Sequence, residues 1–225
     1  MKALLYKGFK LAMHPICYVF IAAFPFMILI PSYPLAVGFI YILACYPILF
    51  LGANKGQQSN DLLFSTLLPV RKKDIVLARI FVVLIMQAAF MLLQSALYPL
   101  ALFINAHIPD SPASPGIGLD GFVSVLAIGV VGYALADLIF FPIYYKHGKS
   151  IVMSTLLTIL GFIVYLSIFS IALPYVPGFE GYVHFLAHSG IGVQFGVLGG
   201  AIVLSALAHV LVYRISAKRL EQVDF

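Results

Sequence analysis

Residues 75–104 read IVLARIFVVLIMQAAFMLLQSALYPLALFI, and Arg79 is the only charged residue among them. A helix needs about 17–25 mostly apolar residues to cross the roughly 30 Å hydrocarbon core of a bilayer. This run is long enough to span a membrane and to project beyond it. The 225-residue chain shares its character, with 63% hydrophobic and 9% charged residues. Soluble domains average about 45–50% apolar and about 25% charged residues. The composition therefore excludes a soluble enzyme, a disordered regulator and a disulfide-stapled secreted domain.

Six apolar segments of spanning length divide the chain. They cover about residues 16–30, 35–51, 75–104, 122–145, 151–176 and 191–213. The sequence therefore predicts an all-α integral membrane protein with six transmembrane helices, folded as one domain over residues 1–225. Cys17 and Cys45 fall inside apolar runs, so we interpret them as small buried side chains.

The basic residues predict the topology. All thirteen lie on one side of the predicted spans: Lys2, Lys7, Lys10, Lys55, Arg71, Lys72, Lys73, Arg79, Lys146, Lys149, Arg214, Lys218 and Arg219. The opposite loops contain Asp110, Asp120 and Glu180 but no Lys or Arg. The positive-inside rule places both termini in the cytoplasm. The net charge of +5 then reflects topology, and we expect no nucleic-acid partner.

Residues 1–14 form a basic amphipathic segment before the first span. Leu4, Leu5, Phe9 and Met13 share one helical face, whereas the lysines fall largely elsewhere. This pattern suits a helix lying in the cytoplasmic interface, and a plain basic flank explains it equally well. Pro15 marks the bend into the first span.

Residues 56–74 form the longest predicted cytoplasmic loop, GQQSNDLLFSTLLPVRKKD. Ser59, Asn60 or Asp61 can cap a short helix, because their side chains accept hydrogen bonds from its first amides. This helix would end at Pro69 and carry the apolar residues Leu62, Leu63, Phe64, Leu67 and Leu68. Apolar residues on a cytoplasmic loop need a partner, either the headgroup layer or a groove on another protein.

The stretch LLPVRKKDIVLAR (67–79) resembles the loop before the third span of ABC-2 type permeases. The opening residues Met1–Pro15 resemble those of permeases from phenol-soluble-modulin exporters. The resemblance implies a coupling helix on a separate ABC ATPase, present in two copies. The residues that it assigns to this contact are Asp61, Leu62, Leu63, Phe64, Leu67, Leu68, Pro69, Arg71, Lys72 and Lys73.

The resemblance also implies a second permease chain, most simply in a homodimer, and export of amphipathic peptides or toxins across a bacterial plasma membrane. ATP and Mg²⁺ would be used by the ATPase, with no cofactor bound to this chain. His147-Gly148-Lys149-Ser150 imitates the end of a phosphate-binding loop, but position 143 is isoleucine instead of the first glycine. We therefore expect no nucleotide site there.

Polar residues inside spans are costly and mark functional or packing sites. Gln87 and Gln94 are seven residues apart on one face of the third span, where joining helices by hydrogen bonds is favoured over lining a pathway. Asp137 in the fourth span is expected to face protein, water or a basic partner such as Lys146. His209 and Gln194 are further polar residues of the sixth span.

Gly192, Gly196 and Gly200 recur every four residues in the sixth span, which permits close approach of two helices. Packing within the chain is favoured there over a dimer contact. Glu180, His184 and His188 share a helical face in an external loop, where a polar surface is favoured over a metal site.

Two other function classes compete with the exporter. A stand-alone secondary transporter or channel is disfavoured by the single intramembrane carboxylate. An intramembrane enzyme is disfavoured because no catalytic motif or pair of carboxylates is present in the sequence.

Overall fold

The computed structural model describes residues 2–12, 15–30, 39, 43, 45–46, 70–107, 119–147, 151–168 and 190–222. All the elements assigned within these ranges are helical. Most of the predicted second span (35–51), residues 56–69 of the predicted coupling loop, and the loop with Glu180, His184 and His188 lie outside the described residues.

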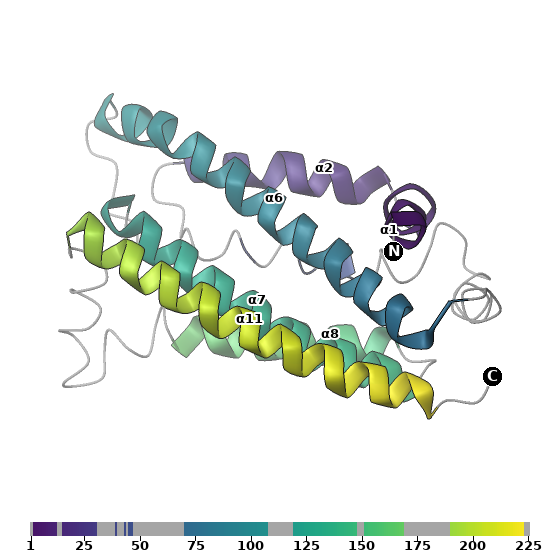
Figure 1. Ribbon diagram of the computed structural model, residues 1–225. Helices are drawn as coiled ribbons and strands as arrows, with labels where there is room; N and C mark the ends of the chain where they lie inside the picture. The colour runs from purple at the N-terminus through teal and green to yellow at the C-terminus, as the bar shows by residue number, and fades with distance from the viewer. Residues whose placement is uncertain are drawn as a thin grey trace.

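Long helices form the body of the structure (Figure 1). The elements are α1 (Lys2–Lys7), the π-helix η1 (Gly8–Ala12), α2 (Pro15–Ala23), the 3₁₀ helix η2 (Phe24–Leu29), α6 (Lys72–His107), the 3₁₀ helix η4 (Leu119–Gly121), α7 (Phe122–His147), α8 (Ile151–Ser167) and α11 (Ile191–Glu221). Among the described residues, α6, α7 and α11 are long and apolar enough to span a membrane. A fourth span results if the bent pair Leu4–Lys10 and Pro15–Leu29 is counted as one.

The packing of the long helices centres on two elements, α7 and α6. Helix α11 runs along α7, α8 packs against α7 as well, and α6 contacts both α11 and the η2 segment. About two thirds of the most apolar stretch of α7 is buried, against 17% of that of α11. Helix α7 is therefore the most buried of the three candidate spans, whereas most of the apolar stretch of α11 faces outward.

The ends of the long helices differ from the predicted bounds. Helix α11 continues to Glu221, eight residues beyond the predicted limit at residue 213, because polar residues can extend a helix out of the bilayer. Pro99 and Pro142 lie inside α6 and α7. Proline is tolerated in membrane helices, where neighbouring groups satisfy the backbone that it frees.

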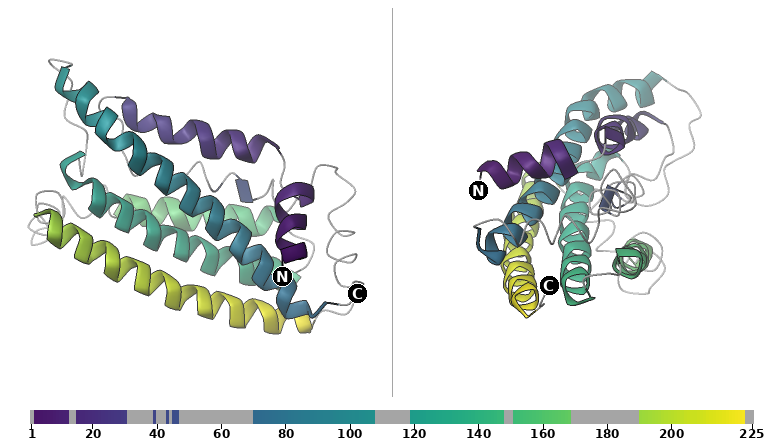
Figure 2. Two further views of the ribbon diagram at one scale, coloured as in Figure 1. Left: turned by 45° about the horizontal axis from the view of Figure 1, so that its top comes forward. Right: turned by 90° about the vertical axis from the view of Figure 1, so that its right-hand side faces the viewer.

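The N-terminal segment turns sharply before the first span. The axes of Leu4–Lys10 and Pro15–Leu29 differ by 79°, and α1 lies across the end of the bundle (Figure 2). A Cβ on Gly8 would lie 2.7 Å from Val82 Cγ2, so glycine allows this segment to approach α6 closely.

Aromatic side chains fill the core. The largest fully buried ones are Tyr46, Tyr133, Tyr145, Phe39, Phe90, Phe140, Phe141 and Phe162. Gly129 on α7 makes room for Phe39, whose ring carbon Cζ would lie 2.6 Å from an added Cβ. Cys17 and Cys45 are buried thiols and are not joined in a disulfide.

Candidate functional site

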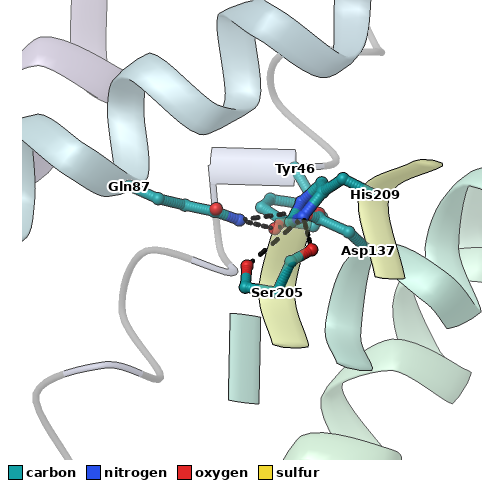
Figure 3. Close-up of polar contacts among 5 residues, drawn as sticks. All are labelled: Tyr46, Gln87, Asp137, Ser205 and His209. Atoms are coloured by element: carbon teal, nitrogen blue, oxygen red, sulfur yellow. Dashed lines mark hydrogen bonds and ion pairs between the residues drawn. The ribbon is translucent and has the colours of Figure 1, made fainter. Parts of the chain in front are cut away.

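A buried polar cluster joins three long helices in the interior of the bundle. We define it as Tyr46, Gln87 on α6, Asp137 on α7, and Ser205 and His209 on α11 (Figure 3). Asp137 is completely buried, and Tyr46 and Gln87 are 1% and 5% exposed. An isolated carboxylate would be very costly to bury at such a position, so its partners decide whether it can be accommodated.

Asp137 receives hydrogen bonds from several directions. The Tyr46 hydroxyl donates to Asp137 Oδ1 at 2.6 Å, and Gln87 Nε2 donates to Asp137 Oδ2 at 3.0 Å. His209 Nε2 lies 2.9 Å from the same Oδ2. Gln87 Nε2 is also within hydrogen-bond distance of the Tyr46 hydroxyl. Each carboxylate oxygen is thus satisfied by side chains of other elements.

The contacts of His209 fix the charge of this pair. Its Nδ1 lies 2.7 Å from the backbone carbonyl of Ser205, which can only accept, so Nδ1 carries a proton. One further proton lies between Nε2 and Asp137 Oδ2. Whether that proton resides on the imidazole or on the carboxyl group, the net charge of the pair is zero. The cluster therefore introduces polarity into the bundle without net charge.

Of the surroundings expected for Asp137, the structure shows protein side chains, and Lys146, the basic residue named as an example, is not the partner. Lys146 is exposed and lies nine residues further along α7, which is roughly 13 Å of helix. His209 on α11 occupies the partner position instead. Both residues had stood out in the sequence as polar groups within spans, and they offer opposite charges, but their pairing was missed. Tyr46 and Ser205 were also missed, since a tyrosine or serine in an apolar segment gives no distinctive signal.

Gln94 lies on the same helix as Gln87 but outside the cluster. It is 3% exposed, and its Oε1 has no hydrogen-bond partner among the described residues. Two turns of α6 separate the two glutamines, so they face the interior at different depths.

The glycine row of α11 is open. A Cβ on Gly192, Gly196 or Gly200 would meet no atom within 4 Å among the described residues. Within that part of the chain, the favoured packing of this row against another helix is therefore not seen. Large apolar neighbours on α11 are also exposed, with Phe195 57% and Val203 62% exposed.

Helix ends meet at the basic end of the bundle. Lys73 Nζ, at the start of α6, lies 3.2 Å from Glu221 Oε1, at the end of α11. The Arg219 guanidinium on α11 donates to the backbone carbonyl of Pro142 on α7. The start of α6 is thus tied to α11, and α11 to α7, next to the predicted coupling loop. Of the predicted coupling residues, Arg71, Lys72 and Lys73 are described, and Arg71 and Lys73 are exposed.

The sequence matches the family model of the ABC-2 family transporter proteins over residues 3–220. The chain belongs to the ABC-2 transporter family. No curated protein and no solved structure matches it. The predicted family is confirmed, and the protein is a multi-pass membrane component of an ABC-2 type transporter. It is a transport subunit without a catalytic domain, and permeases of this family pair with an ABC ATPase.

The cluster suits a structural role in an ABC-2 permease. Among the residues that the structure describes, no three His, Cys, Asp or Glu side chains come together as a metal site. Asp137 and His209 are a pair and not a triad, and their hydrogen bonds are directed at each other and at neighbouring helices. The arrangement joins α6, α7 and α11 at one level of the bundle.

Proposed function

We propose that this ABC-2 permease is the transmembrane subunit of an ATP-driven exporter of amphipathic peptides or toxins. A separate ABC ATPase docks on residues 61–73, and both termini lie in the cytoplasm of a bacterial cell, with six spans in each chain. ATP binding and hydrolysis on the ATPase move the loop, and the loop moves the spans.

The observation that carries the coupling role is the connection at the basic end. Lys73, the last residue of the proposed ATPase contact, belongs to the first turn of α6 and pairs with Glu221 of α11. Helix α6 is continuous over 36 residues. A displacement of the loop therefore passes directly into a helix that also carries Gln87 of the polar cluster.

The distribution of charge supports the proposed orientation. Helix α1, the start of α6 and the ends of α7 and α11 lie at the same end of the bundle (Figures 1 and 2). These elements, together with the adjoining Lys10 and Arg71, carry the basic residues of the described chain, and basic residues favour the cytoplasmic side.

A second copy of the permease is proposed to pack on the glycine row of α11. Lipid tails are as apolar as the side chains of the helices, so the hydrophobic effect does not drive helices together within the bilayer. Helices associate instead where small residues let their backbones approach closely. Gly192, Gly196 and Gly200 supply such a surface, and the described chain leaves it open. The peptide cargo is proposed from the resemblance of the opening residues and the 67–79 stretch to peptide-toxin exporters.

Co-purification tests the ATPase contact. The tagged permease is extracted from its host in mild detergent, and the accompanying ABC ATPase is quantified together with its ATP hydrolysis. Scrambling residues 62–73 should remove the ATPase, whereas Lys218→Gln, which deletes one exposed charge at the same end, should retain it. If the scrambled permease keeps the ATPase and hydrolysis stays coupled to export, the docking assignment is wrong.

Cargo is tested by export from cells. Cells with the intact permease and ATPase should release an amphipathic α-helical peptide to the medium, and cells without the permease should retain it. Equal release from both would overturn the proposed substrate class.

A further inference from the structure

One ion pair joins the ends of two long helices at the basic end of the bundle. Lys73 Nζ lies 3.2 Å from Glu221 Oε1, and the two side chains are 53% and 47% exposed. Lys73 is the second residue of α6, and Glu221 is the last residue of α11. The two helix ends lie together in both further views of the bundle (Figure 2). A protein that docks at this end can therefore reach both charges.

Each charge of this pair lies at the end of its own helix that disfavours it. A helix N-terminus carries a partial positive charge and a C-terminus a partial negative charge, felt over about one turn. Lys73 is at the N-terminus of α6, and Glu221 is at the C-terminus of α11. The neighbouring Asp74 and Arg219 follow the usual preference for their helix ends. Lys73 and Glu221 are thus favoured by each other and by the adjoining helix end, and not by their own helices.

The neighbours of both charges are anchored in the bundle. Leu220, which precedes Glu221, is buried, and Arg219 donates to a backbone carbonyl of α7. On α6, Val76 lies about one turn after Lys73 and is buried as well. The ion pair is therefore set by the positions of two fixed helix ends. A movement that separates these ends breaks it.

Separation of the two helix ends would leave each charge where its own helix disfavours it. Lys73 would keep its ammonium at the positive end of α6, next to the exposed Arg71, and would lose its anion. A carboxylate supplied by another protein would take the place of Glu221 and restore the favourable pairing. An acidic side chain is therefore the partner chemistry that fits the start of α6 once α11 has moved away.

We propose that the Lys73–Glu221 pair is a latch that competes with the ABC ATPase for Lys73. While the latch is closed, Glu221 occupies the ammonium group; when the ATPase docks, an acidic side chain of the ATPase replaces Glu221. This inference rests on the docking site proposed above for residues 61–73. Glu221 is then an autoinhibitory residue, which weakens docking until α6 separates from α11.

The latch is weak enough for docking to open it. An exposed ion pair shifts an equilibrium by at most about fivefold. A partner that binds only the open form has its apparent dissociation constant raised by the inverse of the open fraction. A preference of about five to one for the closed latch therefore raises the apparent dissociation constant about sixfold. Loss of Glu221 should remove this factor and tighten docking.

Binding of the co-purified ABC ATPase to the full-length permease in lipid nanodiscs tests the latch. Glu221→Gln should lower the dissociation constant about two- to sixfold, because the ammonium of Lys73 is then available. Lys73→Gln should raise it. Glu221→Gln added to Lys73→Gln should have no further effect, since the residue that the latch holds is absent. The latch is overturned by an equal gain from Glu221→Gln in both backgrounds, which would show a general charge effect, or by no gain in either.

Lys218→Gln is the matched control on the same helix end. Lys218 is exposed and lies in the last turn of α11, three residues before Glu221. Its substitution removes a charge from this turn and leaves the latch intact. The dissociation constant of the ATPase should therefore stay unchanged. A change as large as that of Glu221→Gln would contradict the assignment to the ion pair.

Acetylation of lysines by a water-soluble N-hydroxysuccinimide ester tests the latch without the ATPase. An ammonium held by a carboxylate reacts more slowly, so Glu221→Gln should speed the acetylation of Lys73. The exposed Lys146 is the internal reference in the peptide mass spectra and should react at an unchanged rate. Unchanged acetylation of Lys73 would refute the latch alone. If acetylation is faster but the ATPase does not bind the unsubstituted permease, the docking site proposed above is wrong, and the inhibitory role of Glu221 fails with it.

Discussion

Removing one member of the Asp137–His209 pair should destabilise the permease strongly. When the shared proton resides on His209, the attraction between the two unit charges 2.9 Å apart is roughly 6 kcal/mol at an effective dielectric constant of about 20. Desolvation of both groups offsets much of this attraction. What remains after deletion of one partner is an uncompensated buried charge, which costs about 3–5 kcal/mol.

His209→Gln and Asp137→Asn are the informative single variants, because both preserve approximate size. His209→Gln leaves the buried carboxyl group of Asp137 without the imidazole that shares its proton. Asp137→Asn places an amide NH₂ donor opposite the Gln87 donor, so one of the two donors must turn away. The double variant removes both members of the pair, and its cost should fall below the sum of the two single costs by about 0.5–3 kcal/mol.

The buried thiols provide the assay. Cys17 and Cys45 are both completely buried, so a thiol-reactive fluorophore reports unfolding as the protein in detergent is heated. For a chain of this length, a loss of 1 kcal/mol lowers Tm by about 2–4 °C. His209→Gln should therefore lower Tm by about 6–20 °C.

Two controls separate the ion pair from general disturbance of the core. Ser205→Ala should change Tm little, because the backbone carbonyl and not the hydroxyl makes the close contact of 2.7 Å to His209. A Tm for His209→Gln within about 1 °C of the unsubstituted protein would refute the reasoning. Strict additivity in the double variant would show that the two residues act independently.

Three more outcomes are expected. Tyr46→Phe removes one donor from the buried carboxyl group and should cost about 1.5–3 kcal/mol, measured by the same thiol assay. Gly129→Ala should lower the free energy of unfolding by about 1–3 kcal/mol, because its methyl group would overlap the Phe39 ring. Gly199→Ala is the control and should be close to neutral, because its methyl group meets no described atom. Equal effects of the two variants would contradict the packing. If the second copy packs on α11, Gly196→Leu should shift the permease from dimer to monomer in detergent. Light scattering measures this shift, and an unchanged dimer would exclude that surface.

The positions of the apolar helices could be predicted from the sequence. The side of each helix that faces the protein interior could not. The presence and approximate positions of α6, α7 and α11 follow from apolar length, since only a sufficiently long apolar run can cross the bilayer, whereas their exact ends do not. In a soluble helix the apolar stripe also indicates the buried face. In this protein lipid and core are both apolar, so α7 is hydrophobic on all sides and its rotation cannot be predicted from periodicity.

The pairing within the polar cluster could not be predicted for a related reason. Asp137 and His209 are 72 residues apart, and Gln87 and Asp137 are 50 apart. Their meeting depends on which helices are neighbours and on how each is rotated. The cost of burying a carboxylate indicated that Asp137 needs partners, but only the arrangement of α6, α7 and α11 selects His209 over Lys146.

The same arrangement ties α6 to the other long helices at two levels, by contacts of unequal strength. On α6, Lys73 and Gln87 are 14 residues apart, and on α11, Glu221 and His209 are 12 apart, which correspond to roughly 21 Å and 18 Å of helix. The outer pair, Lys73 and Glu221, is about half exposed, so its contribution is at most about 1 kcal/mol. The inner hydrogen bond from Gln87 to the buried carboxyl group of Asp137 costs more to break, about 1.5–3 kcal/mol. A force applied at the start of α6 therefore separates the outer pair first, while the cluster continues to hold Gln87 against Asp137. Helix α6 would then tilt about the cluster instead of sliding past α11, and the displacement would grow with distance from the cluster toward both ends of the helix.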